Sequence, residues 1–212
     1  MEIENFSLLM KVIIIFFSLI GLYYKTGLEK KRFKIVSLIY FTNLSLIFCL
    51  IYFLFSIFLG ENHIIQGFIG FIILCVTVTM TVYHFILVPN NRKKGKDYEI
   101  FAFSDIVVHY VVPILTIIYW IIFAEKGLFE YYYPFLWAIP FFIYLIIILL
   151  RAHYGRILEY SQTRYPYDFI DLDYLGLIKT SRNIAILSSI IIILGYIFLL
   201  IDLILKGYIF FN

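Results

Sequence analysis

An acid and an imidazole lie one helical turn apart near the middle of the chain. Asp105 and His109 fall in the apolar segment SDIVVHYVVPILTIIYW, and Thr116 continues the same helical face. A carboxylate in this position can fix the tautomer of the imidazole and raise its basicity, as it does in hydrolytic triads. Pro113 lacks the N–H that would bond the His109 carbonyl, so we expect a perturbed backbone there. The pattern is typical of a general base, although a helix start capped by Ser104 or Asp105 would explain the acid alone.

The segment that carries this pair is one of six apolar stretches. They cover residues 8–24, 35–59, 66–89, 105–124, 132–150 and 183–205. A helix needs about 20 apolar residues to cross the hydrocarbon core of a bilayer. A mean hydropathy of +0.97, with 63% hydrophobic and 15% charged residues, excludes an ordinary soluble domain. We therefore predict an all-α membrane protein of one domain, residues 1–212, with six transmembrane helices that enclose a polar pocket.

The lysines and arginines gather in alternate connections. Of the 17, all except Lys11, Lys126 and Lys206 lie in the first, third and fifth gaps between the apolar stretches. The positive-inside rule then places those gaps in the cytoplasm and both termini outside the cell membrane. We interpret the net charge of +3 as topology and contact with anionic lipid, and not as nucleic-acid binding.

Two further spans carry polar residues at helical spacing. One face of the second span holds Thr42, Ser45 and Cys49, with Asn43 beside them. One face of the third span holds Thr77, Thr81 and His84. An intramembrane hydroxyl usually bonds a carbonyl one turn back, and small polar residues often serve helix packing. We favour these roles for most of them and expect His84 near the headgroups.

Depth along the helices allows a contact between the second and fourth spans. If the second span enters the membrane near Lys34, Thr42 lies about 8 residues, roughly 12 Å, inside. If the fourth enters near Ser104, His109 lies about 5 residues, roughly 8 Å, inside. The two side chains would then occupy similar levels in the cytoplasmic half, so a Thr–His pair is allowed.

The last cytoplasmic connection contains the segment YPYDFID. It is about 30 residues long, and long connections in compact proteins are often functional. Its carboxylates, Asp168, Asp171 and Asp173, lack the spacing of a calcium loop. Cys49 and Cys75 fall inside spans, where packed thiols are the usual interpretation. We assign no metal and no organic cofactor.

Four short motifs together resemble a known family. YFTNLS in the second span, VTVT in the third, HYVVP in the fourth and YPYDFID before the sixth are similar to motifs of a bacterial family of six-pass membrane proteins. That family is related to the eukaryotic androgen-induced protein and the androgen-dependent TFPI-regulating protein. The resemblance covers most of the chain, from about Tyr40 to Asp202. The eukaryotic members are threonine hydrolases that cleave fatty acid esters of hydroxy fatty acids with an intramembrane Thr and His.

The resemblance implies an intramembrane lipid-ester hydrolase. Thr42 would be the nucleophile and His109 the general base, and Asp105 would orient His109. Candidates for binding a fatty acyl ester are Asn43, Ser45, Thr77, Thr81, Tyr83, Arg151 and Asp168; Tyr83, Arg151 and the YPYDFID segment would form the mouth of the pocket. Two other functions stay open: a non-catalytic scaffold or lipid sensor, and a small-solute transporter. The lack of an internal repeat counts against the transporter.

Overall fold

The computed structural model describes residues 2–60, 63–93, 95, 102–158 and 161–211. Among these residues there is no β-strand. Six helical segments are long and apolar enough to cross a membrane: Glu2–Lys25, Phe41–Phe58, Ile65–Lys93, Phe103–Phe123, Tyr133–Tyr154 and Leu172–Gly207. The predicted class, an all-α membrane protein with six spans, is confirmed.

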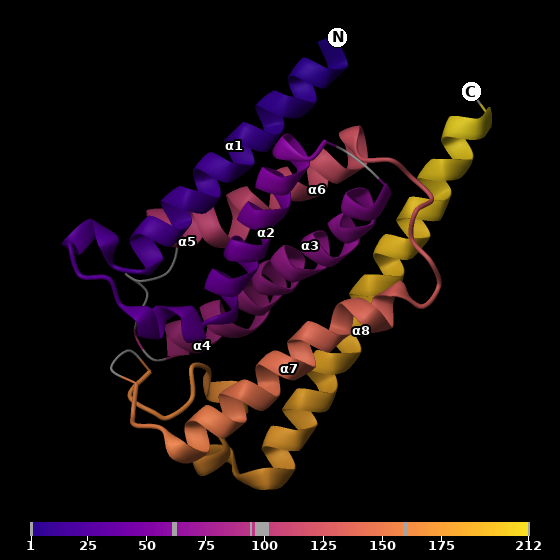
Figure 1. Ribbon diagram of the computed structural model, residues 1–212. Coiled ribbons are helices and arrows are strands. Elements are labelled where there is room, and N and C mark those ends of the chain that lie inside the picture. The colour runs from indigo at the N-terminus through magenta and orange to yellow at the C-terminus, as the bar shows by residue number, and fades with distance from the viewer. Residues whose placement is uncertain (1, 61–62, 94, 96–101, 159–160, 212) are drawn as a thin grey trace. The chain divides into compact units, whose positions relative to one another are not determined.

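The spans are built from eight α-helices and two π-helical turns (Figure 1). In chain order the elements of the first four spans are α1 (Glu2–Lys25), α2 (Phe41–Phe58), α3 (His63–Val82), η3 (Tyr83–Leu87), α4 (Val88–Lys93), α5 (Phe103–Ile106), η5 (Val107–Val111) and α6 (Val112–Phe123). The last two spans are α7 (Tyr133–Tyr154) and α8 (Leu172–Phe211). In their described residues the connections contain the 3₁₀ segments η1 (Leu28–Lys30), η2 (Ile35–Ile39) and η6 (Asp168–Ile170). The π-helical turns are η3 and η5.

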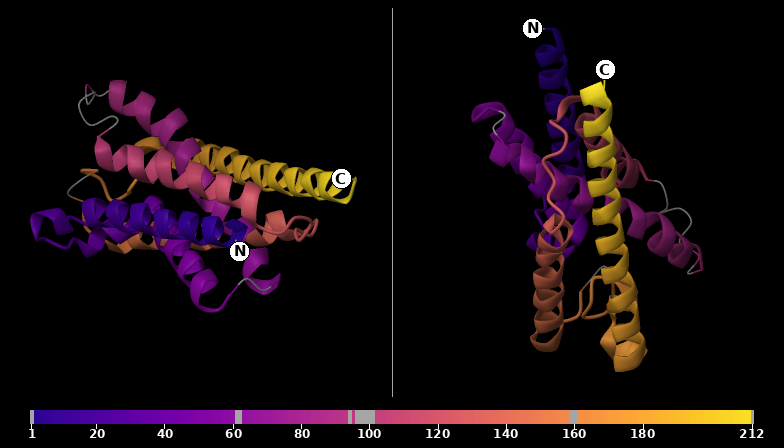
Figure 2. Two further views of the ribbon diagram at one scale, coloured as in Figure 1. Left: turned by 90° about the horizontal axis from the view of Figure 1, so that it is seen from above. Right: turned by 90° about the vertical axis from the view of Figure 1, so that its right-hand side faces the viewer.

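The chain divides into two compact units. The first comprises residues 1–129 and 202–212, and the second residues 130–201. In the first unit α1 packs on α2 and α6, and α3 packs on the same two helices. Figures 1 and 2 show these four helices side by side. Their shared core is apolar and includes Ile14, Leu46, Phe53, Ile73, Val76 and Trp120, all of them buried.

The second span begins later than the sequence suggested. Ile35–Ile39 form η2 and Tyr40 is extended, so the continuous helix starts at Phe41. The Ser37 carbonyl accepts a hydrogen bond from the Asn43 side-chain amide at 2.7 Å, which folds η2 back onto the first turn of α2. Thr42 is therefore the second residue of α2. The expected depth of roughly 12 Å assumes a continuous helix from Lys34, and that assumption is wrong.

Both π-helical turns precede a Val–Pro pair. The N–H of Val88, before Pro89, donates to the Tyr83 carbonyl, and the N–H of Val112, before Pro113, donates to the Val107 carbonyl. Proline has no N–H, and its ring crowds the carbonyl four residues back. A turn widened to five residues moves that carbonyl away. The perturbed backbone expected at Pro113 is thus confirmed, and Pro89 produces a second one that was not expected.

A buried charge fixes the end of α6 within the first unit. Asp202 of α8 is fully buried, and its Oδ2 accepts hydrogen bonds from the N–H groups of Gly127 at 2.8 Å and Phe129 at 3.2 Å. Lys126 donates to the Trp120 carbonyl at 2.5 Å. Burial lowers the pKa of Lys126, and the charge of Asp202 opposes that shift. These contacts hold the connection after α6 and tie the last part of α8 to the first unit.

The second unit contains α7, the connection after it and most of α8. A Cβ added to Gly195 of α8 would lie 2.9 Å from Pro134 Cβ, so glycine is needed for the close approach of the two helices. The Phe135 and Tyr196 rings meet at the same crossing, with centroids 5.8 Å apart. Near its start α8 is kinked at Gly176, whose φ of 73° and ψ of 167° suit glycine.

The distribution of basic residues predicts the orientation of α3 and α4 in the membrane. A cysteine replacing His63 should react with a membrane-impermeant maleimide in intact cells, whereas one replacing Arg92 should react only after permeabilisation. The native Cys49 and Cys75 are buried, so they should give little background. Reaction of the Arg92→Cys protein alone in intact cells would mean that the orientation is inverted, and reaction of both would contradict the span between them.

Candidate active site

His109 is buried in η5 with its two ring nitrogens in different surroundings. Only 4% of the residue is exposed. Nε2 lies 3.6 Å from Asp105 Oδ1, a distance of electrostatic contact, and the Thr79 backbone forms a hydrogen bond with the ring. Nδ1 has no hydrogen-bond partner among the described residues. An acid beside Nε2 favours the tautomer with the proton on that nitrogen, which leaves the Nδ1 lone pair available as a base.

Asp105 also forms an ion pair with Lys25, the last residue of α1. Lys25 Nζ lies 2.6 Å from Asp105 Oδ1, and the two side chains are 26% and 16% exposed. Neither Ser104 nor Asp105 caps the helix, because the N-cap residue is Ala102 and no side-chain cap bond is made. The carboxylate thus lies between an ammonium group and an imidazole.

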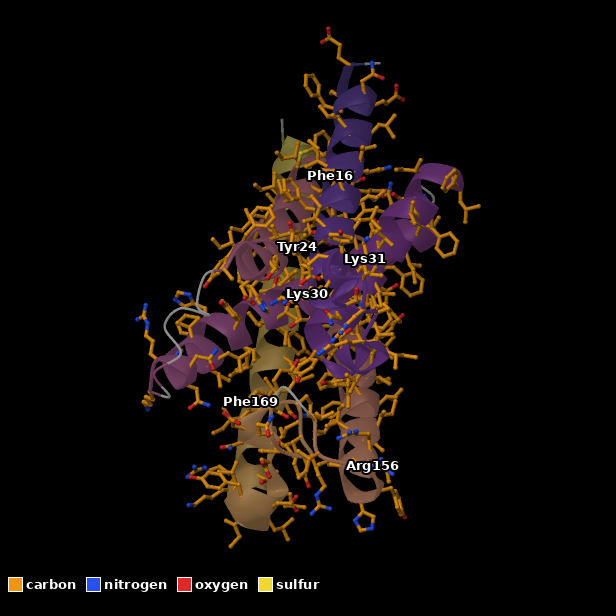
Figure 3. The ribbon with its side chains drawn as sticks, turned by 90° about the vertical axis from the view of Figure 1, so that its left-hand side faces the viewer. Phe16, Tyr24, Lys30, Lys31, Arg156 and Phe169 are labelled. Atoms are coloured by element: carbon orange, nitrogen blue, oxygen red, sulfur yellow. The ribbon has the colours of Figure 1, made fainter. Side chains whose placement is uncertain are left out.

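The sequence interpretation missed Lys25 because it counted this residue only as a topology signal. A carboxylate in the first turn of an apolar span needs a cation nearby. Lys25 ends the first span on the side where the fourth span begins, so the need for a partner made it a candidate. The neighbouring Tyr24, labelled in Figure 3, packs against Phe103 with ring centroids 5.8 Å apart and joins the same helix ends.

Helical spacing places Thr42 at the level of this ion pair. A Cβ added to Gly21 of α1 would lie 2.6 Å from Val108 Cγ1 and 3.1 Å from Leu46 Cδ1, so α1, α2 and η5 meet there. Residues three or four positions apart share a helix face. Because α1 runs antiparallel to the other two, the residues one turn closer to the start of α2 are Lys25, Thr42 and Asp105.

Thr42 is half-buried in the first turn of α2. Its carbonyl accepts a hydrogen bond from the Ser45 hydroxyl at 2.8 Å. Among the described residues its own hydroxyl has no hydrogen bond to the His109 ring. Thr42 and His109 belong to α2 and η5, which pack on each other, and the positive end of the α2 dipole lies at Thr42.

The remaining candidates in α2 and α3 are mostly buried. Asn43 donates to the Ser37 carbonyl, and its Oδ1 has no partner among the described residues; the same holds for the Thr77 hydroxyl. Ser45 is buried and Thr81 is half-buried. Thr79, which the sequence interpretation passed over, is the threonine of α3 beside His109, and its hydroxyl donates to the Val76 carbonyl at 2.7 Å.

Two tyrosine–histidine pairs join η3 to η5. Tyr83 is buried and stacks on His109, with ring centroids 3.9 Å apart and planes 7° apart. His84 is exposed, and its Nδ1 lies 2.9 Å from the Tyr110 hydroxyl. The Tyr83 and Tyr110 rings meet edge to face at 5.9 Å. The two π-helical turns therefore face each other, with one pair inside and the other outside.

Arg151 and Asp168 belong to the second unit. Arg151 donates to the carbonyls of Arg164 at 2.6 Å and Arg156 at 2.8 Å, so its guanidinium closes the connection after α7. Asp168 begins η6 in the YPYDFID segment, and the next residue, Phe169, accepts a hydrogen bond from Asn183 at 2.9 Å. Figure 3 labels Arg156 and Phe169 in this unit. The segment is a folded loop held by side chains of α7 and α8.

Comparisons of the chain with known protein families, with characterised proteins and with solved structures find no match. Within the described residues, no group of three or more His, Cys, Asp or Glu side chains could hold a metal ion.

Replacement of Lys25 by Met should destabilise the protein by about 1–3 kcal/mol, because it leaves the partly buried Asp105 carboxylate without its ammonium partner. Asp105→Asn in the same protein should restore part of the loss. The measurement is equilibrium denaturation in detergent micelles. The matched control is Lys30→Met, since the Lys30–Glu29 pair is 3.7 Å apart with Lys30 79% exposed and should contribute little. Additive losses from Lys25→Met and Asp105→Asn would contradict the coupling.

Proposed function

We propose that the protein is an intramembrane hydrolase of lipid esters, with Thr42 as nucleophile and His109 as general base. The observation that carries the proposal is the environment of His109. The ring is buried, with Asp105 beside Nε2 and no partner on Nδ1 among the described residues. A packing histidine would satisfy both nitrogens, because a buried polar atom without a partner is costly. A general base keeps one nitrogen open for the proton it accepts.

The proposed reaction has two halves. In the first, His109 Nδ1 takes the Thr42 hydroxyl proton while Thr42 Oγ1 bonds to the ester carbonyl carbon and the carbonyl oxygen becomes an oxyanion. The oxyanion collapses, the bond from carbon to the alcohol oxygen breaks, and His109 returns the proton to that oxygen. The acyl group is now an ester of Thr42. In the second half, water gives its proton to His109 and bonds to the acyl carbon. The bond from that carbon to Thr42 Oγ1 then breaks, and His109 returns the proton to Oγ1. The products are a carboxylic acid, an alcohol and the free hydroxyl of Thr42.

The charges around the site suit this sequence. Asp105 beside Nε2 favours the tautomer that leaves the Nδ1 lone pair without a proton, and Lys25 Nζ pairs with the Asp105 carboxylate at 2.6 Å. The first N–H groups of an α-helix lack acceptors within the helix, and they carry the positive end of its dipole. Thr42 lies in that first turn, where the N–H groups of Asn43 and Leu44 already donate to the Tyr40 carbonyl. The α2 dipole would therefore be what favours an oxyanion formed next to Thr42.

The surroundings favour an amphiphilic ester as substrate. The site lies where α1 ends and α2 and α5 begin, at one end of apolar spans. A lipid with its ester group near the headgroup level would place its carbonyl at this height while its chain stays in the hydrocarbon. From the distribution of basic residues, this end faces the cytoplasm of a cell membrane and both termini lie outside.

A fluorophosphonate probe should label the purified protein at Thr42. Labelling should disappear in Thr42→Ala and persist in Thr42→Ser, which keeps a hydroxyl nucleophile. The matched control is Ser56→Ala, because Ser56 is a buried hydroxyl of the same helix that donates to the Phe53 carbonyl at 3.0 Å, well along α2 from Thr42. Labelling that survives Thr42→Ala would remove Thr42 as the nucleophile.

His109→Ala should reduce cleavage of a fluorogenic long-chain fatty acyl ester by ~10²–10⁴-fold, the usual contribution of a general base. His84→Ala is the control, since His84 is exposed and bonds only the Tyr110 hydroxyl among the contacts described above. Its loss should be much smaller. Equal losses of cleavage in both variants would mean that His109 is wrongly assigned as the base. Unchanged lipid binding, with no hydrolysis by any of the proteins, would favour a lipid sensor or scaffold.

A further inference from the structure

The Tyr83–His109 stack has a geometry that packing alone does not require. The two rings are nearly parallel, 7° apart in plane and 3.9 Å between centroids. The other ring pairs around it, Tyr83–Tyr110 and His84–Tyr110, meet edge to face, at 81° and 88°. Aromatic pairs commonly adopt either the edge-to-face or the offset-stacked arrangement. Only the face-on arrangement presents the electron-rich face of the tyrosine to the imidazole.

We propose that Tyr83 is a positioning residue for His109: its ring fixes the imidazole plane and stabilises the cationic ring that forms when His109 takes a proton. The inference rests on the proposed function. It gives Tyr83 the role of holding the base His109, and not a place at the mouth of a substrate pocket, since only 4% of Tyr83 is exposed.

The distances around Asp105 show why His109 needs a second source of stabilisation. Asp105 Oδ1 lies 2.6 Å from Lys25 Nζ and 3.6 Å from His109 Nε2. The carboxylate is therefore neutralised mainly by Lys25, and its attraction for an imidazolium is reduced. Lys25 itself repels such a cation. The Thr79 backbone hydrogen-bonds the ring edge, and the face of Tyr83, 3.9 Å away and shielded from water, adds an attraction for positive charge over the whole ring.

The backbone explains how the stack is held. Tyr83 is the first residue of η3 and His109 lies in the middle of η5, and each π-helical turn is fixed by the proline that follows it. A ring held face to face cannot rotate about its Cβ–Cγ bond without a clash. With the ring plane fixed and Nε2 beside Asp105, the position of Nδ1, which shares the Cε1 carbon with Nε2, is fixed as well. Tyr83 thus sets where the basic nitrogen points.

The test compares Tyr83→Phe and Tyr83→Leu in the full chain in lipid nanodiscs, with the fluorogenic fatty acyl ester as probe. Phe keeps the stacked ring, so kcat should stay within about twofold. Leu removes it, so kcat should fall roughly 5- to 30-fold with KM little changed. In a His109→Ala background, Tyr83→Leu should have no further effect, because Tyr83 acts through His109.

The control for folding is Tyr119→Leu. Tyr119 is as buried as Tyr83, but its ring packs on Phe53 at 5.0 Å, away from the histidine. This variant should retain kcat at a temperature where all proteins are folded. An equal loss of kcat in Tyr83→Leu with and without His109, or a loss in Tyr83→Phe as large as in Tyr83→Leu, would overturn the inference.

Ring-proton NMR of selectively labelled histidine separates this inference from the proposed function. The chain has four histidines, so the His109 signal is identified by its absence in His109→Ala. A tyrosine stacked on the ring shifts its protons upfield. Tyr83→Leu should remove that shift and Tyr83→Phe should keep it. If Tyr83→Leu removes the shift but the native protein cleaves no ester, the proposed hydrolase is wrong and the stack is supported. If the shift is unchanged in Tyr83→Leu, the stack itself is wrong.

Discussion

The constraint on which the site depends is the need to satisfy backbone hydrogen bonds inside an apolar bundle. A proline in a transmembrane helix removes one N–H donor, and lipid offers no replacement. At Pro89 and Pro113 the chain adapts by widening the preceding turn. The widened turns rotate the side chains before each proline relative to an ideal helix. Tyr83 and His109 lie in these two turns, so their face-to-face contact follows from where the prolines stand in the sequence.

The charged groups follow from a second constraint, the cost of an unpaired charge in the membrane. Asp105 lies in the first turn of its span and is largely buried, so it requires a cation, and the antiparallel α1 supplies Lys25. The small Gly21 one turn away allows α1 to approach Val108 and Leu46 closely enough for that contact. The Lys25–Asp105 ion pair thus depends on Gly21 and on the antiparallel direction of α1. The same packing of α1 against α2 places Thr42 at the level of the ion pair.

The sequence predicted the helix class, the number of spans and the local pair Asp105–His109, because each depends on residues close together in the chain. It did not predict the start of α2, since the fold back at Ser37 depends on a hydrogen bond to Asn43 and not on hydropathy. The Lys25–Asp105 and Tyr83–His109 contacts join different spans, and helical periodicity says which residues share a face but not which faces meet. The second Val–Pro pair was visible in the sequence, and comparison with the first could have indicated η3.

The two histidines of the facing π-helical turns show how position decides chemistry. Both have a tyrosine partner, yet His84 is exposed with a hydrogen bond to Tyr110, whereas His109 is buried under the face of Tyr83. Water can accept or supply protons at His84, so nothing in its surroundings selects one proton acceptor. At His109, an acid lies beside Nε2, and Nδ1 has no hydrogen-bond partner in the part of the chain that the structure describes, so a group brought to that nitrogen can exchange a proton with it. In the reaction we propose, that group is the Thr42 hydroxyl, and this difference in surroundings is why we propose the buried histidine, and not the accessible one, as the base.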